Sequence, residues 1–592
     1  MDFKLRGNFS KNKETALYEI LMNRGVTDLE SFITPTQEKC DVCAYLLDNI
    51  EDGAKMLLKH LEAESKICII VDSDADGYTS SSILWNYIKK VYPNANLSFT
   101  VHEGKQHGLE DKIDWLVYNC NYNLVICPDS ASFDTEYQER LNRIGVDCLV
   151  IDHHEAPEDF SIINVPSNTI IINNQLSEKY TNKTLCGAGM VYKFCQVLDE
   201  ILQVSFAEEF IDLVALGEIS DVMSKTSIET NYLIERGLQQ IKNKGFQTLL
   251  ETQSYSLKEK ALFPYYGLTS IDVAFYISPL INAITRMGTI DEKETMFYCF
   301  TDPMRKRQST KRGAKQGEVE YAAEQTARVA KNVKSRQDRI KEKAIDLIDM
   351  KIKKENLLDN NILVIQMKLS DEIPSELTGL IAGACVSKYQ RPCLILRKNE
   401  EGFLRGSGRN NERFKELPDL KAFLESSGYF EYCMGHANAH GSSIHESKLD
   451  AFIKYSNEYF TEDAFKNCYI VDYVLDANEF GLDAFLGSLA SHPEYFGNGI
   501  EEIEVIINNV PISSFFVMGK NKDCVKLQYN NVEYVRFKDE NFIEELSFLD
   551  KEKTMINICG KLYLNEWNGK KSVQCNISDY EIVESSQSKY DF

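Results

Sequence analysis

The sequence has no long uncharged apolar run, since no stretch approaches the roughly 18 apolar residues that suggest a transmembrane helix. Its opening segment, "MDFKLRGNFS", lacks the apolar core of a signal peptide. An excess of positive charge is also missing, because 66 Lys and Arg residues face 90 Asp and Glu residues, for a formal net charge of −24. A chain this acidic does not bind nucleic acid over its whole surface. Any DNA or RNA binding therefore needs a local basic patch or metal ions.

The 16 cysteines do not form a paired metal-binding pattern. Cys40 and Cys43 make one CxxC without a second pair, whereas a structural zinc site needs four ligands. Many of the other cysteines lie in apolar stretches, where a free thiol packs as a small hydrophobic group. Together with the missing apolar and signal-like segments, these thiols predict a cytoplasmic protein without membrane contact.

What the sequence does contain is ordinary globular composition, with 43% hydrophobic and 26% charged residues over 592 positions. Between 66 and 173, short β-rich runs alternate with helical or loop segments of roughly 20 residues, which is typical of a parallel sheet covered on both faces. The predicted strands are 66–72, 97–101, 122–128, 146–152 and 169–173.

The order of these patterns predicts an α/β protein in four parts. Residues 1–310 would form the domain with the parallel sheet and a helical N-terminal segment, and 311–358 a basic segment with a long polar helix from 317 onward. Residues 359–464 would form a second α/β domain and 465–592 a small all-β barrel. The basic run 305–315 has six Lys or Arg residues and no acidic residue. It is either a solvated helix face or a guide for single-stranded DNA.

Three strand ends of the predicted parallel sheet carry Asp or His residues. The carboxyl ends of parallel strands share one edge, which is where open sheets bind ligands. Carboxylates crowded at that edge repel one another unless cations compensate their charge, and oxygen ligands suit Mg²⁺ or Mn²⁺. The residues are Asp72, Asp74 and Asp76 after the first strand, Asp129 after the third, and Asp152, His153 and His154 after the fourth.

Asp221 follows an apolar helix, "IDLVALGEIS", and would complete a site for two metal ions. Two plainer interpretations compete with this one. The first acidic segment is also what a helix-capping turn looks like, and two adjacent histidines are also common on protein surfaces.

The motifs "DSDADG", "DHH" and "LVALGEISDV" together resemble the DHH phosphoesterase superfamily, and within it the RecJ family of single-strand-specific 5′→3′ DNA exonucleases. The resemblance extends over nearly the whole chain, through "ISPLINAITRMG", "RGSGRN" and "GHANAHG" to the C-terminal strands. It implies a DHH phosphoesterase domain, a DHH-associated domain at 359–464 and an OB-fold barrel at the end. The implied activity is two-metal-ion hydrolysis of single-stranded DNA from its 5′ end, in DNA recombination or repair.

The resemblance also implies a role for each residue of the site. Asp129 would bridge two Mn²⁺ or Mg²⁺ ions, with Asp74 on the first ion. His154 would act at the scissile phosphate as an electrostatic or acid catalyst, and Asp152 would orient an imidazole. The implied metal ligands are Asp74, Asp76, Asp129, His153 and Asp221.

The substrate would be held by a second set of residues. Arg286 would contact a backbone phosphate, and the segments around 407–409 and 435–441 would hold the 5′-terminal region. The implied set is Lys105, Asn282, Arg286, Ser407, Arg409, Gly435, His436 and Gly441. Trp567, Tyr529 and Phe537 are candidates for stacking on bases. A single-strand-binding protein or a helicase would be the protein partner of a monomeric enzyme.

Several positions depart from the family pattern, among them Leu280, Met434 and His440, and the effect of three others stays open. Ile70 stands where several relatives have a histidine, and His102 and His107 take the places of an Arg and a Tyr. Two other functions also stay open. One is an oligoribonuclease or cyclic-dinucleotide phosphodiesterase of the same superfamily, and the other is a non-catalytic nucleic-acid-binding subunit.

Overall fold

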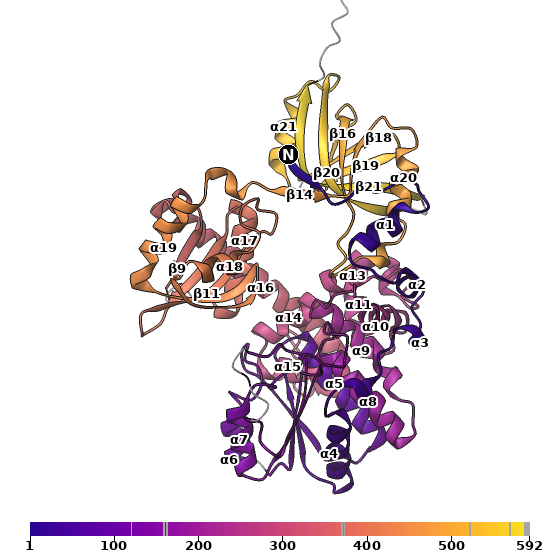
Figure 1. The fold of residues 1–592 in the computed structure, drawn as a ribbon, viewed down its shortest axis with the longest axis vertical. Helices are drawn as coiled ribbons and strands as arrows, with labels where there is room; N and C mark the ends of the chain where they lie inside the picture. Colours follow the sequence, from indigo (N-terminus) through magenta and orange to yellow (C-terminus); the bar gives the residue numbers. More distant parts are fainter. Residues whose placement is uncertain are drawn as a thin grey trace, which may run out of the picture. The chain divides into compact units, whose positions relative to one another are not determined.

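The computed structural model describes residues 1–119, 121–157, 160, 164–368, 371, 373–519, 522–567 and 570–584. The chain divides into two compact units (Figure 1). Unit 1 comprises Met1–Arg24, Arg339–Pro493 and Glu501–Phe592, and unit 2 comprises Gly25–Asp338 and Glu494–Ile500. The first 24 residues therefore cluster with unit 1, whereas the sequence placed them with the parallel sheet.

Unit 2 is built on the predicted five-stranded parallel sheet. The strands run in the order β3-β2-β4-β5-β6, and every neighbouring pair is parallel. Their bounds agree with the predicted runs to within two residues: β2 (Ile67–Val71), β3 (Leu97–Val101), β4 (Leu124–Pro128), β5 (Asp147–Asp152) and β6 (Thr169–Asn173).

Both faces of this sheet are buried, which explains why its strands are apolar throughout rather than alternating. Along β2, Ile67, Ile69 and Val71 belong to the large core shared with helices α4 (Ile50–Glu62), α5 (Ala75–Val91) and α8 (Gly187–Leu202). Cys68 and Ile70 belong to a second core with α6 (Ile113–Asn119) and α7 (Thr135–Arg143). Figure 1 shows the two helical layers on either side of the strands.

The rest of unit 2 is mainly helical. Helix α9 is buried along nearly its whole length and ends just before Asp221, so it brings that residue to the sheet. The helices are α2 (Leu29–Ile33), α3 (Gln37–Cys40), α9 (Ile211–Ser220), α10 (Ile228–Gln239), α11 (Lys244–Thr252), α12 (Ser254–Leu257), α13 (Ser270–Tyr276), α14 (Ser278–Met287) and α15 (Ile290–Thr301).

The basic run does not form a helix face, so that interpretation is wrong. It lies in an antiparallel hairpin of β7 (Lys306–Gln308) and β8 (Val319–Tyr321), and the long helix α16 (Ala322–Glu355) begins five residues later than predicted. Gly313 and Gly317 adopt φ = +84°, a left-handed conformation that favours a turn over a helix. Helix α16 then continues from the end of unit 2 into unit 1.

The second α/β part, in unit 1, has a five-stranded mixed sheet of order β12-β13-β11-β10-β9. Only β9 and β10 pair in parallel. Its strands are β9 (Leu363–Met367), β10 (Cys393–Lys398), β11 (Phe403–Arg409), β12 (Phe430–His436) and β13 (Ala439–His445), and its helices are α17 (Thr378–Tyr389), α18 (Leu420–Ser426) and α19 (Glu446–Tyr459).

The C-terminal part of unit 1 is a seven-stranded sheet of order β15-β16-β20-β21-β19-β18-β17, accompanied by α20 (Leu482–Leu489) and α21 (Glu540–Ser547). Near the N-terminus, β1 (Asp2–Leu5) pairs in parallel with β14 (Cys468–Val471), and α1 (Ala16–Asn23) follows. This pairing explains why the first residues cluster with unit 1. The sheet strands are β15 (Tyr473–Asp476), β16 (Glu504–Pro511), β17 (Phe516–Met518), β18 (Cys524–Tyr529), β19 (Val532–Arg536), β20 (Thr554–Trp567) and β21 (Lys570–Glu584).

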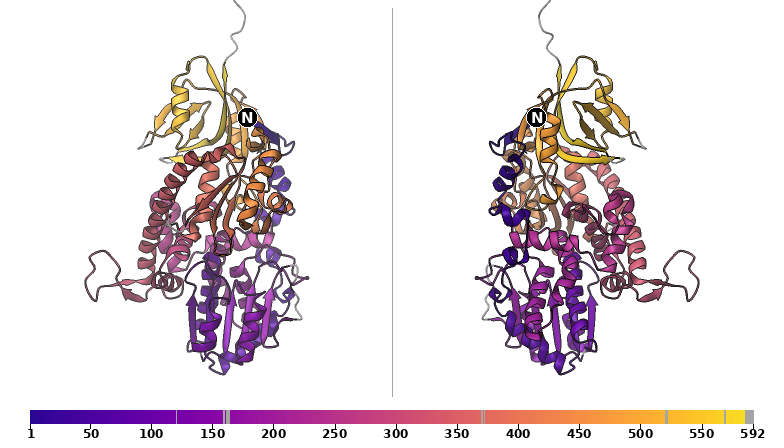
Figure 2. Two further views of the ribbon diagram at one scale, coloured as in Figure 1. Left: turned by 90° about the vertical axis from the view of Figure 1, so that its left-hand side faces the viewer. Right: turned by 90° about the vertical axis from the view of Figure 1, so that its right-hand side faces the viewer.

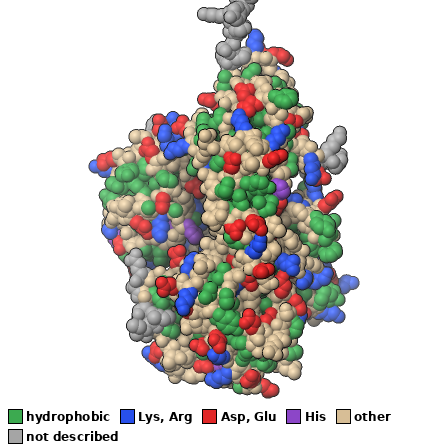
Figure 3. Space-filling view, turned by 45° about the vertical axis from the view of Figure 1, so that its right-hand side comes forward, with side chains coloured by type: hydrophobic (Ala, Val, Ile, Leu, Met, Phe, Trp, Pro, Cys, Tyr) green, Lys and Arg blue, Asp and Glu red, His purple; other side chains and the backbone are tan. Residues whose placement is uncertain are grey.

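Two surface properties bear on function. None of the helices in the described part of the chain is long and apolar enough to cross a membrane. On the face shown in Figure 3, acidic and basic side chains are interspersed, so the charge of −24 does not gather there into one acidic field.

Candidate metal centre

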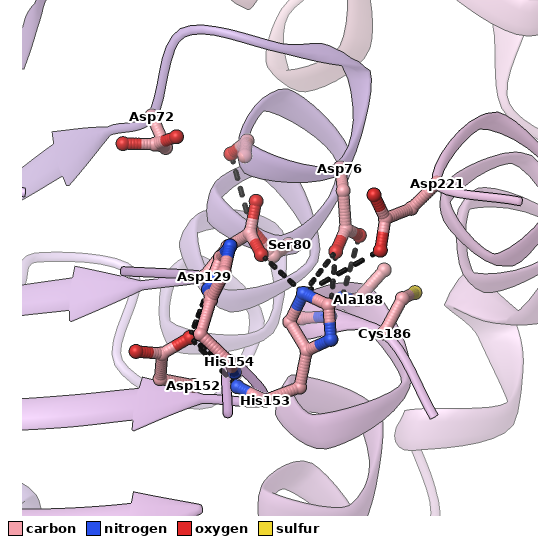
Figure 4. Close-up of polar contacts among 12 residues, drawn as sticks. Asp72, Asp76, Ser80, Asp129, Asp152, His153, His154, Cys186, Ala188 and Asp221 are labelled. Carbon is pink, nitrogen blue, oxygen red and sulfur yellow. Dashed lines mark hydrogen bonds and ion pairs between the residues drawn. The ribbon is translucent and has the colours of Figure 1, made fainter. Parts of the chain in front are cut away.

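The acidic and histidine residues meet at the carboxyl edge of the parallel sheet (Figure 4). Asp72 follows β2, Asp129 follows β4, and Asp152 ends β5. Asp74 is the N-cap of α5, and its Oδ1 accepts a hydrogen bond of 3.0 Å from the backbone N–H of Gly77. The helix-capping interpretation of this segment is thus correct for Asp74, but it does not account for the other carboxylates.

His153 lies at the point where three carboxylates converge. Its Nε2 atom is 3.1 Å from Asp129 Oδ1, 3.5 Å from Asp221 Oδ2 and 3.7 Å from Asp76 Oδ2. The ligand atoms of Asp76, His153 and Asp221 all lie within 4.8 Å of one another, so one ion could touch all three. Together with Asp129, these residues make four of the five ligands expected from the sequence.

The side chain of Asp129 is the strongest sign of a cation. It is 2% exposed, and its Oδ1 accepts no well-formed hydrogen bond from the residues that the structure describes, although the neutral His153 ring has its Nε2 3.1 Å away. A buried carboxylate oxygen without a donor is costly in free energy unless a cation or another partner compensates its charge. Its backbone is also unusual, with φ = +68° and the N–H donating to Ile151 O at 2.8 Å. The chain thus holds this carboxylate in a strained, buried position, as a functional group often is.

The pKa shifts of the cluster also indicate a cation site. Burial, and then the neighbouring carboxylates of Asp76 and Asp74, raise the pKa of Asp129 well above its ordinary value. The same causes raise the pKa of Asp221 to about 9. Burial lowers the pKa of His153, which keeps its imidazole neutral and able to act as a ligand. A carboxylate-rich set with one imidazole fits a divalent cation such as Mn²⁺ or Mg²⁺.

Asp76 is oriented by the N-terminus of α8. Its Oδ2 accepts a hydrogen bond of 2.6 Å from Gly187 N, and its Oδ1 one of 2.9 Å from Ala188 N. Gly187 is required by space, because a Cβ there would lie 2.5 Å from the Cβ of Asp129. The sequence alone did not indicate this contact, although the closely spaced glycines of "LCGAGM" are a signal for a close approach of the backbone.

The two adjacent histidines have different surroundings. His154 Nδ1 lies 2.7 Å from Asp152 Oδ1, which also accepts a hydrogen bond of 2.7 Å from the backbone N–H of His153. Burial alone would lower the pKa of His154, but the hydrogen bond and charge of Asp152 outweigh it and raise the pKa to about 9. The His154 side chain is 54% exposed, so a positively charged, oriented imidazole lies beside the cluster and within reach of a ligand.

His107, one of the departures from the family pattern, meets Asp72. Its Nδ1 lies 2.5 Å from Asp72 Oδ2, and the N–H of Gly108 donates to Asp72 Oδ1 at 3.1 Å. The ligand atoms of Asp72, Asp74 and His107 form a second group within 4.8 Å. Asp74 thus groups with His107 rather than with Asp129. The pairing of Asp74 and Asp129 on one ion stays a prediction.

The candidate substrate residues divide between the two units. Asn282 and Arg286 lie on α14 of unit 2. Burial lowers the pKa of Arg286 while the charge of Asp74 opposes that shift, so Arg286 lies within electrostatic range of the cluster. Lys105 is exposed in the loop that also carries His107.

The remaining substrate candidates come together in the mixed sheet of unit 1. Ser407 on β11 pairs with Gly441 on β13, and its Oγ lies 2.9 Å from the Oγ1 of Thr378, the first residue of α17. Gly435 and His436 lie at the end of β12, so "GHANAHG" is a β-hairpin. Arg409 passes so close to α17 that a Cβ at Gly379 would lie 2.4 Å from its Nη2.

Of the aromatic residues suggested for base stacking, Phe537 is 51% exposed. Tyr529 Oη donates to Asn478 Oδ1 at 2.7 Å. The side chain of Trp567 lies outside the described part of the structure.

Comparison with known proteins is consistent with this geometry. Residues 66–218 match the model of the DHH family N-terminal domain, and residues 471–579 match that of the RecJ OB domain. The chain is 36% identical, over the full length of both proteins, to the SPbeta prophage-derived single-strand DNA-specific exonuclease YorK of Bacillus subtilis. The chain belongs to the RecJ family. The single-stranded-DNA-specific exonuclease RecJ of Bacillus subtilis is 22% identical, over 95% of this chain and 68% of that protein.

The fold of the RecJ family is recognisable across the whole chain. The crystal structure of RecJ from Thermus thermophilus in complex with Mn²⁺ superposes with a TM-score of 0.69 at 17% identity, covering 99% of this chain and 79% of that one. The same protein in complex with Mg²⁺ gives a TM-score of 0.64. The predicted α/β fold with a DHH domain and a C-terminal OB domain is therefore confirmed.

Proposed function

We propose that the protein is a metal-dependent exonuclease that degrades single-stranded DNA from the 5′ end. One observation carries this conclusion. A chain that matches a single-strand DNA-specific exonuclease over its full length also has the carboxylates and the histidine expected from its sequence gathered at one sheet edge, around a buried carboxylate oxygen that accepts no well-formed hydrogen bond from the described residues.

The proposed metal ligands are those that the sequence suggested. Asp76, Asp129, His153 and Asp221 would hold one divalent cation, and Asp74 with the bridging Asp129 would hold the other. Asp72 and His107 lie beside Asp74 and are available to the same ion. When bound, two such cations stabilise the charge that develops on a phosphodiester during hydrolysis.

His154 and Asp152 are the proposed catalytic pair. The Asp152 carboxylate accepts the Nδ1–H of His154, which fixes the ring and leaves the Nε2–H to face a phosphate. The protonated ring would stabilise negative charge on a non-bridging phosphate oxygen, or it would donate its Nε2 proton to the leaving oxygen as a general acid. The two adjacent histidines would thus have separate roles, one as a ligand and one as a catalyst.

Substrate contacts are proposed for both units. Lys105, Asn282 and Arg286 would contact phosphates near the metal centre. The sheet of unit 1 would bind the 5′-terminal region through Ser407, Arg409, Gly435, His436 and Gly441. The chain would have four domains with boundaries at 310, 358 and 464, except that the first 24 residues cluster with unit 1.

Cellular context is also part of the proposal. The enzyme would act as a monomer, and a single-strand-binding protein or a helicase would supply the strand. Every described cysteine is a free thiol, which supports the reducing environment of a cytoplasm.

A timed digest with end-labelled DNA tests the function. Single strands labelled at the 5′ end should release labelled product at the earliest times with Mn²⁺ or Mg²⁺, whereas strands labelled at the 3′ end should release label late. EDTA should abolish both. A blunt duplex should resist, and a dinucleotide should be cut no faster than a long strand. Faster cleavage of the dinucleotide would instead identify a small-substrate phosphodiesterase.

A further inference from the structure

The β7–β8 hairpin, residues 306–321, has one face anchored to its own unit. Arg307 forms an ion pair with Asp291 at the start of α15. Glu320, which is buried, accepts a hydrogen bond of 2.9 Å from Ser309 Oγ and one of 2.7 Å from Arg328 Nη2 on α16. The inward-facing charges of the hairpin are thus paired within the protein.

The opposite face and the tip of the hairpin carry unpaired positive charge. Lys306, Arg312 and Lys315 are exposed, and none of them has a carboxylate oxygen within 4.0 Å among the described residues. Lys311 is also exposed, with Glu320 Oε1 3.4 Å away. Glu318 is the exposed acid of the hairpin, and its Oε2 accepts a hydrogen bond from the backbone N–H of Lys315.

The tip is open to a large ligand. Figure 2 shows the hairpin projecting from the helices around it. An added Cβ at Gly313 or Gly317 would meet no atom within 4 Å. Four cations therefore lie on a protruding arm of a chain whose net charge is −24.

The base of the hairpin is connected to the metal centre through α15. Within the first turn of this helix, Asp291 pairs with the hairpin, and the buried Lys293 donates to the carbonyl oxygens of His102 at 2.9 Å and Glu103 at 2.6 Å. These carbonyls begin the loop that carries His107, the partner of Asp72. One helix turn thus contacts both the hairpin and a loop of the metal centre.

We propose that the β7–β8 hairpin is a cationic arm that binds the phosphodiester backbone of single-stranded DNA on the same unit as the metal centre. The inference rests on the proposed function, since it concerns how the substrate is held. Charge complementarity supports it, because mobile Lys and Arg side chains on an open loop contact phosphates without reading bases. Such a contact would also offset the repulsion between an acidic protein and DNA.

The test is the salt dependence of DNA binding. A full-length triple variant combines Lys306→Gln, Arg312→Gln and Lys315→Gln. Its binding to a labelled single strand is measured in EDTA by fluorescence anisotropy. Each phosphate contact to a single strand contributes about 0.7 to the slope of log K against log [salt], so the slope should become shallower by about 2. The affinity ratio of wild type to variant should then shrink about 18-fold between roughly 50 and 200 mM salt.

Two control variants keep the measurement specific. The charge-conserving triple Lys306→Arg, Arg312→Lys and Lys315→Arg should retain the wild-type slope, because only the charge is needed. The second control removes three cations elsewhere in unit 2, through Lys55→Gln, Lys59→Gln and Arg143→Gln on α4 and α7. Lys59 and Arg143 lie near the amino ends of β2 and β5, opposite the metal centre, so this triple should also keep the wild-type slope.

The outcomes separate the arm from the function. If the hairpin variant has the wild-type slope, or if the second control lowers the slope equally, the proposal that the hairpin binds DNA phosphates is wrong. If the slope falls but the wild type cuts no single strand with Mn²⁺, the arm is a nucleic-acid contact and the proposed exonuclease activity is wrong. With active enzyme, the KM ratio of a long strand to a tetranucleotide should rise in the hairpin variant, and an unchanged ratio would contradict a role in holding substrate.

Discussion

Replacing Asp129 with Asn should make the protein more stable than the wild type without metal and less stable than the wild type with metal. Without metal, the wild type buries this carboxylate beside Asp72, Asp74 and Asp76, and burial with those charges raises its pKa. Asn is similar in size, is uncharged and tolerates the observed φ of +68° better than Ala. The apo variant should therefore be more stable than the apo wild type, and it should lose most of the stabilisation that a cation provides.

The magnitude follows from linkage. Each unit by which the pKa of a buried carboxyl is raised costs about 1.4 kcal/mol of folding free energy in its ionised form. At pH 7 the cost has an upper limit of about 4 kcal/mol, because at that point protonating a carboxyl of ordinary pKa becomes cheaper than burying its charge. The penalty is absent below pH of about 4 and grows as the pH rises toward the folded pKa. For unit 2, with roughly 320 residues, a difference of 1.4–4 kcal/mol corresponds to about 2–6 °C in Tm.

Metal should reverse the order of the two proteins. A cation at about 1,000 times its Kd stabilises the wild type by about 4.1 kcal/mol, or about 6 °C for a unit of this size, which is enough to offset the largest apo difference. The variant should show little of this shift, because the proposed bridging ligand is absent.

Thermal melts of both full-length proteins, in EDTA and in Mn²⁺, give the four Tm values to be compared. Turnover on single-stranded DNA is measured alongside. An apo variant less stable than the apo wild type would refute the argument from buried charge. An undiminished shift with Mn²⁺, or wild-type turnover, would refute Asp129 as a ligand.

Three further outcomes are expected. His154→Ala should lower kcat by roughly 10²–10⁴-fold with little loss of DNA binding, whereas His153→Ala should weaken metal binding. If excess Mn²⁺ rescues the His154 variant but not the His153 variant, the two roles are reversed. Gly187→Ala should push Asp129 out of place, because the new Cβ would lie 2.5 Å from the Asp129 Cβ, and turnover should fall about 10²-fold; wild-type turnover would show that the site tolerates this shift. Phe537→Ala, in binding titrations, should cost about 1–3 kcal/mol of affinity for long single strands if its exposed ring stacks on a base, and unchanged affinity would remove it from the strand-binding surface.

Part of this protein could be determined from the sequence alone. The strands of the parallel sheet are continuous apolar runs because both of their faces are buried, so their bounds were readable. Asp72, Asp129 and Asp152 stand directly at strand ends, and parallel strands place their carboxyl ends at one edge. The meeting of these residues therefore followed from local patterns and one topological rule.

Other features depended on contacts between segments far apart in the chain. Gly187 matters only because α8 approaches Asp129, and no local pattern measures that distance. His107 meets Asp72 across 35 residues, through a loop whose carbonyls Lys293 holds from α15. The basic run was likewise ambiguous, because no local pattern shows that Arg307 pairs with Asp291 or Glu320 with Arg328. Composition and spacing report which groups are present and how they repeat, whereas their partners are chosen by packing, which only the tertiary structure decides.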